Sequence, residues 1–524
     1  MITYKQDVKE KSREILWEHA IFSLTAQRNN VKILNEQYII KIWDYIYNNC
    51  KYTKNNSVFK EPNIDYLNKW CDFSESTYEN KRASDLKIIY LCGPEPENDI
   101  DVILKYGIRV ENIWAIESDA KSYNKALENA RVKYPMLKIY KGKINEFLKT
   151  YPLKFDIIYL DFTKSLLTEF QIIHNIFDNQ SLAQLGVLIV NTTLPDANDE
   201  NINFLSKFFI DQNRVEGKVL GLKNEDREVT WFADSSRCYG YCEPGDLKDV
   251  VAENFTSAYS SFSSLYPMIY ASSISPLYRI TKSEILYNKI FLEKDLLNIE
   301  MNKIYSNEYI DFVNHSEYGF VKLMSKNNGI ERSWKNYYDN KENSILNRTE
   351  ISKLTSLIRM GLCRETSKIY NEKFLKSTLN TYKIMDKIEK SRFFTDILFP
   401  NILIEMFINQ IGFTYHPIIN NHKRISYTAK TRTMYTDIFT FDQCRSFYDW
   451  MPMIEFYDAS VDICEKQMLI RSFLDAIGGK QYGTTPIATY GSGSSIISFG
   501  EREWAKFVDR FPERIDLNTI KEYE

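Results

Sequence analysis

LKIIYLCGPEPENDI, residues 86–100, is a short apolar run that ends at a glycine and continues into an acidic loop with two prolines. More apolar runs follow, separated by amphipathic segments of about ten to fifteen residues, the pattern of alternating strands and helices. They are NIWAIE (112–117), LKIYKG (137–142), FDIIYLD (155–161) and GVLIVNTT (186–193). Strands that are apolar on both faces are typical of a parallel sheet covered by helices. The sequence therefore predicts a doubly wound α/β domain over residues 86–290.

The region before this domain has a different periodicity. Residues 1–85 are predicted to form a helical N-terminal extension, because apolar residues recur at helical spacing from Leu16 to Leu24. Inside the domain, KVLGL (218–222) and EVTWFA (228–233) flank a polar turn. They are expected to form an antiparallel hairpin that closes the sheet.

The region after this domain is less regular. Residues 291–345 are predicted to be a helical connection that ends in a polar, Asn-rich linker. Residues 346–524 are predicted to form a mixed, mainly helical C-terminal domain that binds a substrate or a partner. At a prior of roughly one domain per 150 residues, a chain of 524 residues is long enough for this division.

Composition excludes several classes of protein. The chain has 67 Lys and Arg against 70 Asp and Glu, a net charge of −3, so it does not bind nucleic acid through bulk positive charge. A local basic patch remains compatible with that charge. No run approaches the roughly 18 apolar residues of a membrane span, and the charged N-terminus does not resemble a signal peptide. We therefore expect a cytoplasmic protein without a membrane partner, whose eight cysteines are reduced thiols.

The loop after the first strand selects among ligands. In an open α/β sheet the ligand lies outside the carboxyl ends of the strands. Residues 93–99 keep one glycine, Gly93, and add three acidic side chains and two prolines, which lack an N–H donor. A phosphate group would be repelled by these charges. S-adenosylmethionine has no phosphate and carries cationic groups, so the loop favours it over dinucleotides and ATP.

The second strand ends in a further acid, Glu117. A carboxylate at this position can accept hydrogen bonds from both hydroxyls of a ribose. The alternative is a strand-end acid that caps the next helix together with Ser118 or Asp119. Both interpretations stay open at this point.

Taken together, Gly93, Glu117 and FDIIYLDFT (155–163) resemble the class I S-adenosylmethionine-dependent methyltransferases over residues 86–193. The resemblance implies a Rossmann-like, methyltransferase-type sheet with the cofactor over the first and fourth strand ends. It implies S-adenosylmethionine as cofactor and a transferase activity. The residues it would assign to the cofactor are Gly93, Glu95, Glu117, Ser118 and Asn145, and those facing the methyl group and acceptor are Asp161 and Phe162.

The chain also departs from that family. Its first loop has one glycine where the family has several, and Lys143 stands where an acid often contacts adenine. Asp161 has a second interpretation as a turn residue that ends the fourth strand. An alternative function is therefore a catalytically inactive methyltransferase-like scaffold that binds a protein or nucleic acid in an assembly.

One basic segment near the carboxyl end predicts nucleic-acid binding. Between Tyr415 and Asp437 there is no acid. Cations interleaved with aromatic rings suit single-stranded nucleic acid, which needs phosphate contacts and stacking surfaces. The candidate contacts are Lys423, Arg424, Tyr427, Lys430 and Arg432. The alternative is a solvated hairpin with ordinary charge, but together with the length of the chain this segment favours a methyltransferase acting on RNA or DNA.

A metal site is not expected. Cys238 and Cys242 stand four residues apart, but no second pair of ligands is near them in the sequence. They are interpreted as free cysteines in a loop.

Overall fold

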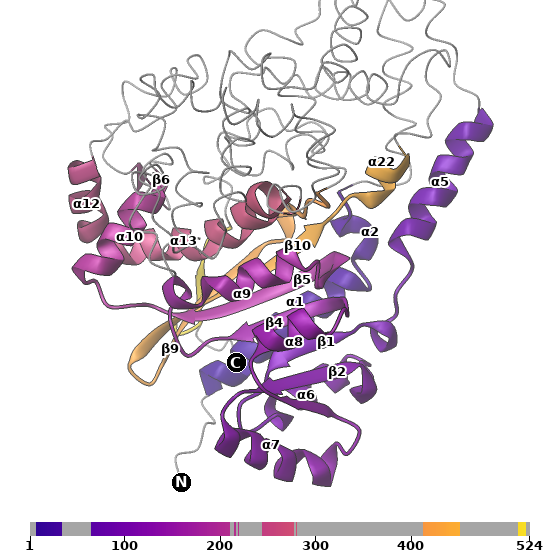
Figure 1. Ribbon diagram of the computed structural model, residues 1–524, viewed down its shortest axis with the longest axis horizontal. Helices are drawn as coiled ribbons and strands as arrows, with labels where there is room; N and C mark the ends of the chain where they lie inside the picture. The colour runs from indigo at the N-terminus through magenta and orange to yellow at the C-terminus, as the bar shows by residue number, and fades with distance from the viewer. Residues whose placement is uncertain are drawn as a thin grey trace, which may run out of the picture.

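The computed structural model describes residues 7–33, 64–209, 214–215, 218–219, 244–276, 279, 412–450 and 512–519 (Figure 1). All structural statements below concern these residues. The helices are α1 (Asp7–Leu24), α2 (Arg28–Val31), α5 (Ile64–Tyr78), α6 (Glu97–Lys105), α7 (Ala120–Lys133), α8 (Ile144–Thr150), α9 (Leu166–Asp178), α10 (Asp199–Phe209), α12 (Pro244–Glu253), α13 (Phe255–Ile269) and α22 (Arg445–Trp450). Single turns are η1 (Ala83–Asp85), η2 (Val110–Asn112), η4 (Tyr270–Ile274) and η7 (Ile419–Asn421).

Five parallel strands form the centre of the molecule, and each coincides with one of the apolar runs. They are β1 (Ile88–Leu91), β2 (Ile113–Glu117), β3 (Lys138–Lys141), β4 (Phe155–Asp161) and β5 (Leu182–Thr193). Their spatial order is β3-β2-β1-β4-β5, and every neighbouring pair is parallel. This is the strand order of a doubly wound, Rossmann-like sheet, so the predicted fold class is confirmed.

The sheet is completed by strands far away in the sequence. Strand β10 (Arg432–Asp442) pairs antiparallel with β5, from Met434 opposite Thr193 to Asp442 opposite Leu185. Strand β9 (Lys423–Ala429) pairs antiparallel with β10. Two short strands, β8 (His416–Pro417) and β11 (Ile515–Asp516), pair with β10 and β9, which gives a nine-stranded sheet.

The expected hairpin does not close this sheet, and its second arm, residues 228–233, lies outside the described residues. The described part of residues 218–222, strand β7 (Lys218–Val219), pairs with β6 (Arg214–Val215) in a separate two-stranded sheet. The place beside β5 belongs to β10, whose residues from Met434 onward are buried on both faces. Strands β9 and β10 therefore belong to the same sheet as β1–β5, although they lie beyond the domain boundary predicted at residue 346. Most of the other residues of the predicted C-terminal domain lie outside the described residues.

Helices cover both faces of this sheet (Figure 1). On one face, α1, α6 and α7 share a core with β1, β2, β4 and β5. On the other face, α9 and α13 contact each other through aromatic rings, including Phe170, His174 and Tyr266. None of the described helices is long and apolar enough to cross a membrane.

The N-terminal helix α1 belongs to the core of the sheet domain. Its apolar face, predicted from the spacing of Leu16 to Leu24, is buried against the strands, and its other described contacts reach β9 and β10. The Trp17 ring packs edge-on against Tyr159, with 5.5 Å between ring centroids, and against Tyr90 at 6.4 Å. The described part of residues 1–85 contains the helices α1, α2 and α5, and residues 1–6 and 34–63 lie outside the described residues.

Candidate functional site

The loop between β1 and α6 begins with a glycine in the left-handed region. Gly93 has a φ of 59°, and an added Cβ would meet no atom within 4 Å. The requirement for glycine therefore comes from the backbone conformation rather than from packing. The space over its Cα is open, so a ligand could approach the backbone closely here.

Two of the loop's three acids are engaged by other side chains. The Glu95 Oε1 atom lies 3.3 Å from Lys125 Nζ, and its Oε2 accepts a hydrogen bond from Asn98 Nδ2 at 3.2 Å. Asp99 is buried, and its Oδ1 accepts a hydrogen bond from the Trp17 indole at 2.9 Å. These two carboxylates have local structural roles.

Arg13 of α1 also contacts Asp99, with 3.5 Å between Nε and Oδ1. Burial raises the pKa of Asp99, while Arg13 and the Trp17 hydrogen bond partly oppose the shift. In the other direction, burial alone would lower the pKa of Arg13, but Asp99, then Tyr159 and Asp161, raise it. Arg13 therefore lies within electrostatic reach of both the β1 and the β4 ends.

The third acid of this loop, Glu97, differs from Glu95 and Asp99 in its hydrogen bonding. It opens α6, and one of its carboxylate oxygens, Oε2, is buried without a hydrogen-bond partner among the described residues. The nearby Cys92 thiol has its pKa raised by burial, then by Glu117 and Asp99, with a smaller contribution from Glu97. The acids of the first loop and of the second strand thus meet around the end of β1.

Glu117 ends β2 as predicted, and its Oε1 accepts a hydrogen bond from the Asp119 backbone N–H at 2.7 Å. Capping of α7 is performed by Asp119, which accepts from the Ser122 N–H at 2.8 Å. Ser118 is exposed. The second oxygen of Glu117 therefore stays available to a ligand.

Asn145 follows β3 in the first turn of α8. Its Oδ1 atom is buried without a hydrogen-bond partner among the described residues. Lys143 occupies the position just before the helix and makes no side-chain capping bond. The free acceptor after β3 is therefore an amide oxygen, two residues beyond the lysine.

Asp161 ends β4 and is held by the neighbouring strand. Asn191 of β5 donates from Nδ2 to Asp161 Oδ1 at 2.7 Å and to the Tyr427 hydroxyl at 3.0 Å. Its Oδ1 accepts from the Thr436 hydroxyl at 2.8 Å, which fixes the orientation of the amide. Asp161 is half-buried, so its carboxylate is oriented by Asn191 and is still accessible to a ligand.

Three carboxylates at this edge of the sheet have no cationic partner. Among the described residues, no Lys, Arg or His nitrogen lies within 4 Å of Glu97, Glu117 or Asp161. Glu117 and Asp161 end β2 and β4, and Glu97 begins the helix that follows β1, so the three follow neighbouring strands of the sheet. This edge of the sheet can therefore bind a cation through its carboxylates. It can also bind the hydrogen-bond donors of a ligand through acceptor atoms such as Asn145 Oδ1.

Phe162 differs from its predicted role. Only 5% of its surface is exposed, and its backbone N–H donates to the Asn191 carbonyl at 2.9 Å. The ring packs in the interior, which does not favour stacking on a substrate.

The predicted nucleic-acid segment is divided between the interior and the surface. Arg424 and Tyr427 are 2% and 4% exposed, so the prediction that they contact phosphates and bases is wrong. The reason is that β9 lies inside the sheet between β10 and β11. Lys423 is half-buried, while Lys430 and Arg432 are exposed at the turn between β9 and β10.

Arg424 belongs to a buried cluster around Asp437, which we call the Asp437 cluster. The Asp437 carboxylate lies 3.5 Å from Arg424 Nε, 2.9 Å from Arg514 Nη2 and 3.0 Å from His422 Nε2. It also accepts hydrogen bonds from the hydroxyls of Ser263 and Ser264 in α13. Burial alone would raise the pKa of Asp437, but Arg514, His422 and Arg424 together hold it well below its usual range.

Metal binding receives no support from the described residues, which contain no group of three His, Cys, Asp or Glu side chains able to hold an ion. Cys238 and Cys242 lie outside the described residues.

The sequence interpretation missed three members of this site. Asn191 could have been found, because it ends the strand next to β4 and carboxyl ends of parallel strands meet at one edge. Glu97 was recognised as part of an acidic loop, but Glu95 was preferred. Arg13 has no local signal, since only the packing of α1 on the sheet brings it to Asp99.

Comparisons with known proteins assign no family to this chain. No protein-family model matches the chain, and no curated protein matches it. Among solved structures it is similar to yhhF of Escherichia coli, provisionally named a methyltransferase, with 16% identity and a TM-score of 0.19 over 22% of this chain and 61% of that chain.

Two further structures align in the same way. A S-adenosylmethionine-dependent methyltransferase of Clostridium acetobutylicum has 15% identity and a TM-score of 0.18 over 34% of this chain and 61% of its own. The CcbJ methyltransferase of Streptomyces caelestis has 15% identity and a TM-score of 0.18 over 29% of this chain and 56% of its own. The chain thus spans less than two thirds of each, and similarity at this level carries no argument about activity. The fold rests on the strand order.

Proposed function

We propose that the protein binds S-adenosylmethionine at the carboxyl ends of β1, β2 and β4 and transfers its methyl group to an acceptor at Asp161. The observation that carries the proposal is the set of three carboxylates, Glu97, Glu117 and Asp161, without a cationic partner among the described residues. In the Asp437 cluster, by contrast, the buried carboxylate is paired. Unpaired acids at the ligand-binding edge of a doubly wound sheet favour a cationic ligand without phosphate.

The residues present fit this cofactor. It has cationic sulfonium and amino groups, ribose hydroxyls and an adenine amine, and when bound it supplies an electrophilic methyl group. Within the described part of the chain, Glu97 Oε2 and Asn145 Oδ1 are buried acceptors without hydrogen-bond partners, which suits an ammonium and an aromatic amine, respectively. Glu117 suits the ribose hydroxyls, and Gly93 leaves space beside its backbone.

Asp161 is assigned to the acceptor. Its carboxylate, oriented by Asn191, would accept a hydrogen bond from an acceptor hydroxyl or amine and hold the nucleophilic atom in place. It could also take the proton as the nucleophile loses it. Most of the rate would come from positioning two reactants, which is the main contribution that a protein makes to direct displacement.

For the substrate we propose RNA or DNA. Lys430 and Arg432 are exposed at the β9–β10 turn. Because Met434 pairs with Thr193 at the end of β5, this turn lies at the same edge of the sheet as Asp161. Two exposed cations at the same edge of the sheet as the acceptor position favour a polyanion, whose backbone they would bind.

The test is calorimetric titration of the full chain with S-adenosylmethionine and S-adenosylhomocysteine. We expect micromolar binding that weakens about tenfold or more in Glu117→Ala, the range expected for lost hydrogen bonds to a charged group. Glu128→Gln, an exposed acid on α7, is the matched control and should bind as the wild type does. Absence of heat and of a thermal shift at millimolar ligand would overturn the proposal.

Transfer is tested separately, with S-adenosylmethionine labelled in the methyl group and pools of RNA and DNA. We expect label in one of the two pools, and loss of that label in Asp161→Asn with cofactor binding retained. Cofactor binding without label in either pool would contradict the substrate but not the cofactor.

A second candidate is a scaffold that has the fold without the activity. The observation that favours it is the side chain of Arg13, whose pKa responds to Asp99 and Asp161 and which therefore places a cation near the acceptor position. Such a cation would compete with a sulfonium. If Arg13→Ala gains binding of S-adenosylmethionine that the wild type lacks, the scaffold is the correct function.

A further inference from the structure

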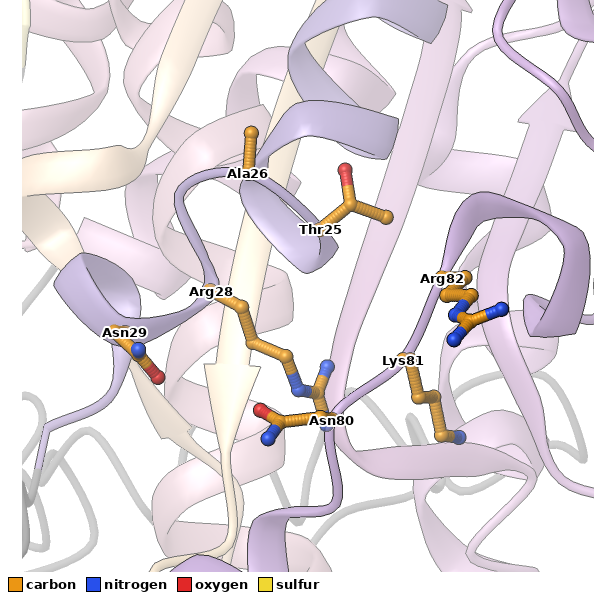
Figure 2. A pocket seen from close by; sticks show the side chains of 7 residues that line it. All are labelled: Thr25, Ala26, Arg28, Asn29, Asn80, Lys81 and Arg82. Carbon is orange, nitrogen blue, oxygen red and sulfur yellow. The ribbon is translucent and has the colours of Figure 1, made fainter.

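A polar cavity lies at the opposite edge of the sheet from the site described above. It has a volume of about 260 Å³ and is lined by the turn after α1, residues 25–29, and by the segment before η1, residues 80–82 (Figure 2). Lys81 contacts Asp156, near the start of β4, whereas Asp161 ends the same strand. The cavity is therefore independent of the proposed methyltransferase site.

The lining of this cavity is cationic. Arg28, Lys81 and Arg82 contribute side chains to it, Asn29 and Asn80 add amides, and no acidic residue lines it. Figure 2 shows the Arg28 head group beside Asn80, which is carried by the same segment as Lys81 and Arg82. This composition matches an anion, since guanidinium and ammonium groups are the usual donors to phosphate oxygens.

Arg28 is the unusual member of the lining. It is 4% exposed, and its guanidinium donates only to backbone carbonyls: Nε to Glu79 at 2.8 Å, Nη1 to Leu24 at 3.3 Å, and Nη2 to Tyr78. Among the described residues no carboxylate lies within 4 Å of it. Three hydrogen bonds leave two of the five N–H groups of an arginine unused.

Carbonyl dipoles explain only part of this arrangement. The contacted carbonyls end α1 and α5, so Arg28 offsets the partial negative charge of two helix C-termini. A buried cation is ordinarily balanced by a full counter-charge. Burial lowers the pKa of Arg28, opposed by Asp156 and Asp442 at longer range, which agrees with a missing partner.

The two other cations differ in their balance. Lys81 forms an ion pair with Asp156, with 2.7 Å between Nζ and Oδ1, and so contributes hydrogen bonds more than net charge. Arg82 is exposed, and among the described residues its guanidinium has no carboxylate within 4 Å, although its backbone N–H donates to Asp85. A ligand anion would therefore face one buried and one exposed guanidinium.

We propose that this cavity binds a small phosphate-bearing anion, either inorganic phosphate or a phosphomonoester, through Arg28, Lys81 and Arg82. The planar fork of an arginine matches the oxygens of a phosphate. The volume is slightly below the roughly 300–1,000 Å³ typical of sites for drug-sized ligands, which favours a small anion. The Asn29 and Asn80 amides would donate to the remaining oxygens.

The experiment is calorimetric titration of the full chain with inorganic phosphate and with glycerol phosphate, at an ionic strength kept constant with NaCl. We expect saturable binding that weakens about tenfold or more in Arg82→Gln, because a charge-assisted hydrogen bond is lost. Asn80→Asp, which places a carboxylate in the cavity, should weaken it further. Tighter binding of glycerol phosphate than of phosphate would identify a phosphomonoester as the ligand, and the reverse would identify the free ion.

Arg109→Gln is the matched control, because Arg109 is an exposed arginine outside the cavity. Equal binding by wild type, Arg82→Gln and Asn80→Asp would assign any heat to general surface charge and overturn the proposal. No heat at about 10 mM of either anion would also overturn it, because that limit corresponds to an affinity too weak for a built site. Arg28→Gln would also remove contacts to two helices, so its effect would combine lost stability with lost binding.

Discussion

Two groups of carboxylates in the sheet domain differ in whether cationic side chains pair with them. Asp437 is buried on β10 and meets two guanidiniums, an imidazole and two serine hydroxyls. Glu97 lies at the start of α6, Glu117 and Asp161 end strands, and none of the three has a Lys, Arg or His nitrogen within 4 Å among the described residues. The first group is electrostatically complete within the chain, and the second is not.

This difference separates charge that maintains the fold from charge that awaits a ligand. Removing one partner from a completed buried group leaves an uncompensated charge, which is strongly destabilising. Removing a carboxylate that has no partner costs the fold little and lowers mutual repulsion among the acids. Stability and ligand affinity should therefore respond to different residues, and the following measurements test that separation.

The largest effect is expected for Asp437→Ala. It leaves Arg424 and Arg514 buried without their shared carboxylate, so we expect a loss of about 3–5 kcal/mol in the free energy of unfolding. Urea denaturation measures it. Asp101→Ala, which breaks an ion pair between exposed side chains, is the control and should leave the midpoint nearly unchanged. Equal shifts in the two variants would contradict the comparison.

The next effect is a pH dependence from His422. Burial lowers the pKa of His422 to about 4, against an ordinary value of 6.5, although Asp437 opposes the shift. The imidazole is therefore protonated below about pH 6.5 in the unfolded chain but only below about pH 4 in the folded chain. The free energy of unfolding falls as the pH is lowered through this window. Between pH 7 and 5 we expect His422 to contribute a loss of about 2 kcal/mol.

The measurement is urea denaturation at both pH values together with NMR titration of the imidazole. His422→Asn should reduce the pH dependence by the amount assigned to His422. An imidazole that titrates near its ordinary pKa in the folded protein would show that the Asp437 cluster holds a charged histidine, and the prediction would fail.

A smaller effect, on affinity alone, is expected for Glu97→Gln. The substitution keeps the size of the side chain and removes a charge that has no partner, so stability should change by less than about 0.5 kcal/mol. Affinity for S-adenosylmethionine should fall about tenfold, because a hydrogen bond to a charged group is weakened. Calorimetry and urea denaturation on the same preparation separate the two, and a destabilised variant with unchanged affinity would reverse the roles assigned here.

The smallest effect is expected at the surface. Arg432→Gln should weaken binding to RNA or DNA a few-fold and reduce the slope of log affinity against log salt by about one, the signature of one lost phosphate contact. Fluorescence anisotropy at several salt concentrations measures it. A slope that is the same in wild type and variant would remove Arg432 from the proposed interface.

Sequence patterns were sufficient for the centre of the fold. All five apolar runs are strands. Four of them, β1, β2, β4 and β5, are largely buried, as strands of a covered parallel sheet are, whereas β3 lies at the edge of the sheet and is half-buried or exposed. Strand pairing at the sheet edge was not accessible in this way. The hairpin predicted from residues 218–233 was expected beside β5, but β10 takes that place. Local alternation does not rank strand partners that are hundreds of residues apart.

The candidate site was predictable to a similar degree. Positions fixed by strand ends, such as Glu117 and Asp161, follow from the rule that ligands bind at carboxyl ends. Arg424 was misassigned because its sequence neighbours include no acid, while its actual partner Asp437 faces it across the β9–β10 pair. The role of a cationic side chain depends on the residue that lies opposite it. The register of strand pairing determines that residue, and the local composition does not.

The pairing of β5 with β10 also determines when the sheet can be completed during translation. Thr193 leaves the ribosome long before Met434, its partner in the ladder. At about 5–20 residues per second, roughly 240 intervening residues take on the order of 10–50 s to translate. During that interval the apolar edge of β5 is complete but unpaired, and exposed strand edges recruit other chains. The nascent protein is therefore expected to depend on chaperones that cover this edge until the return strand emerges.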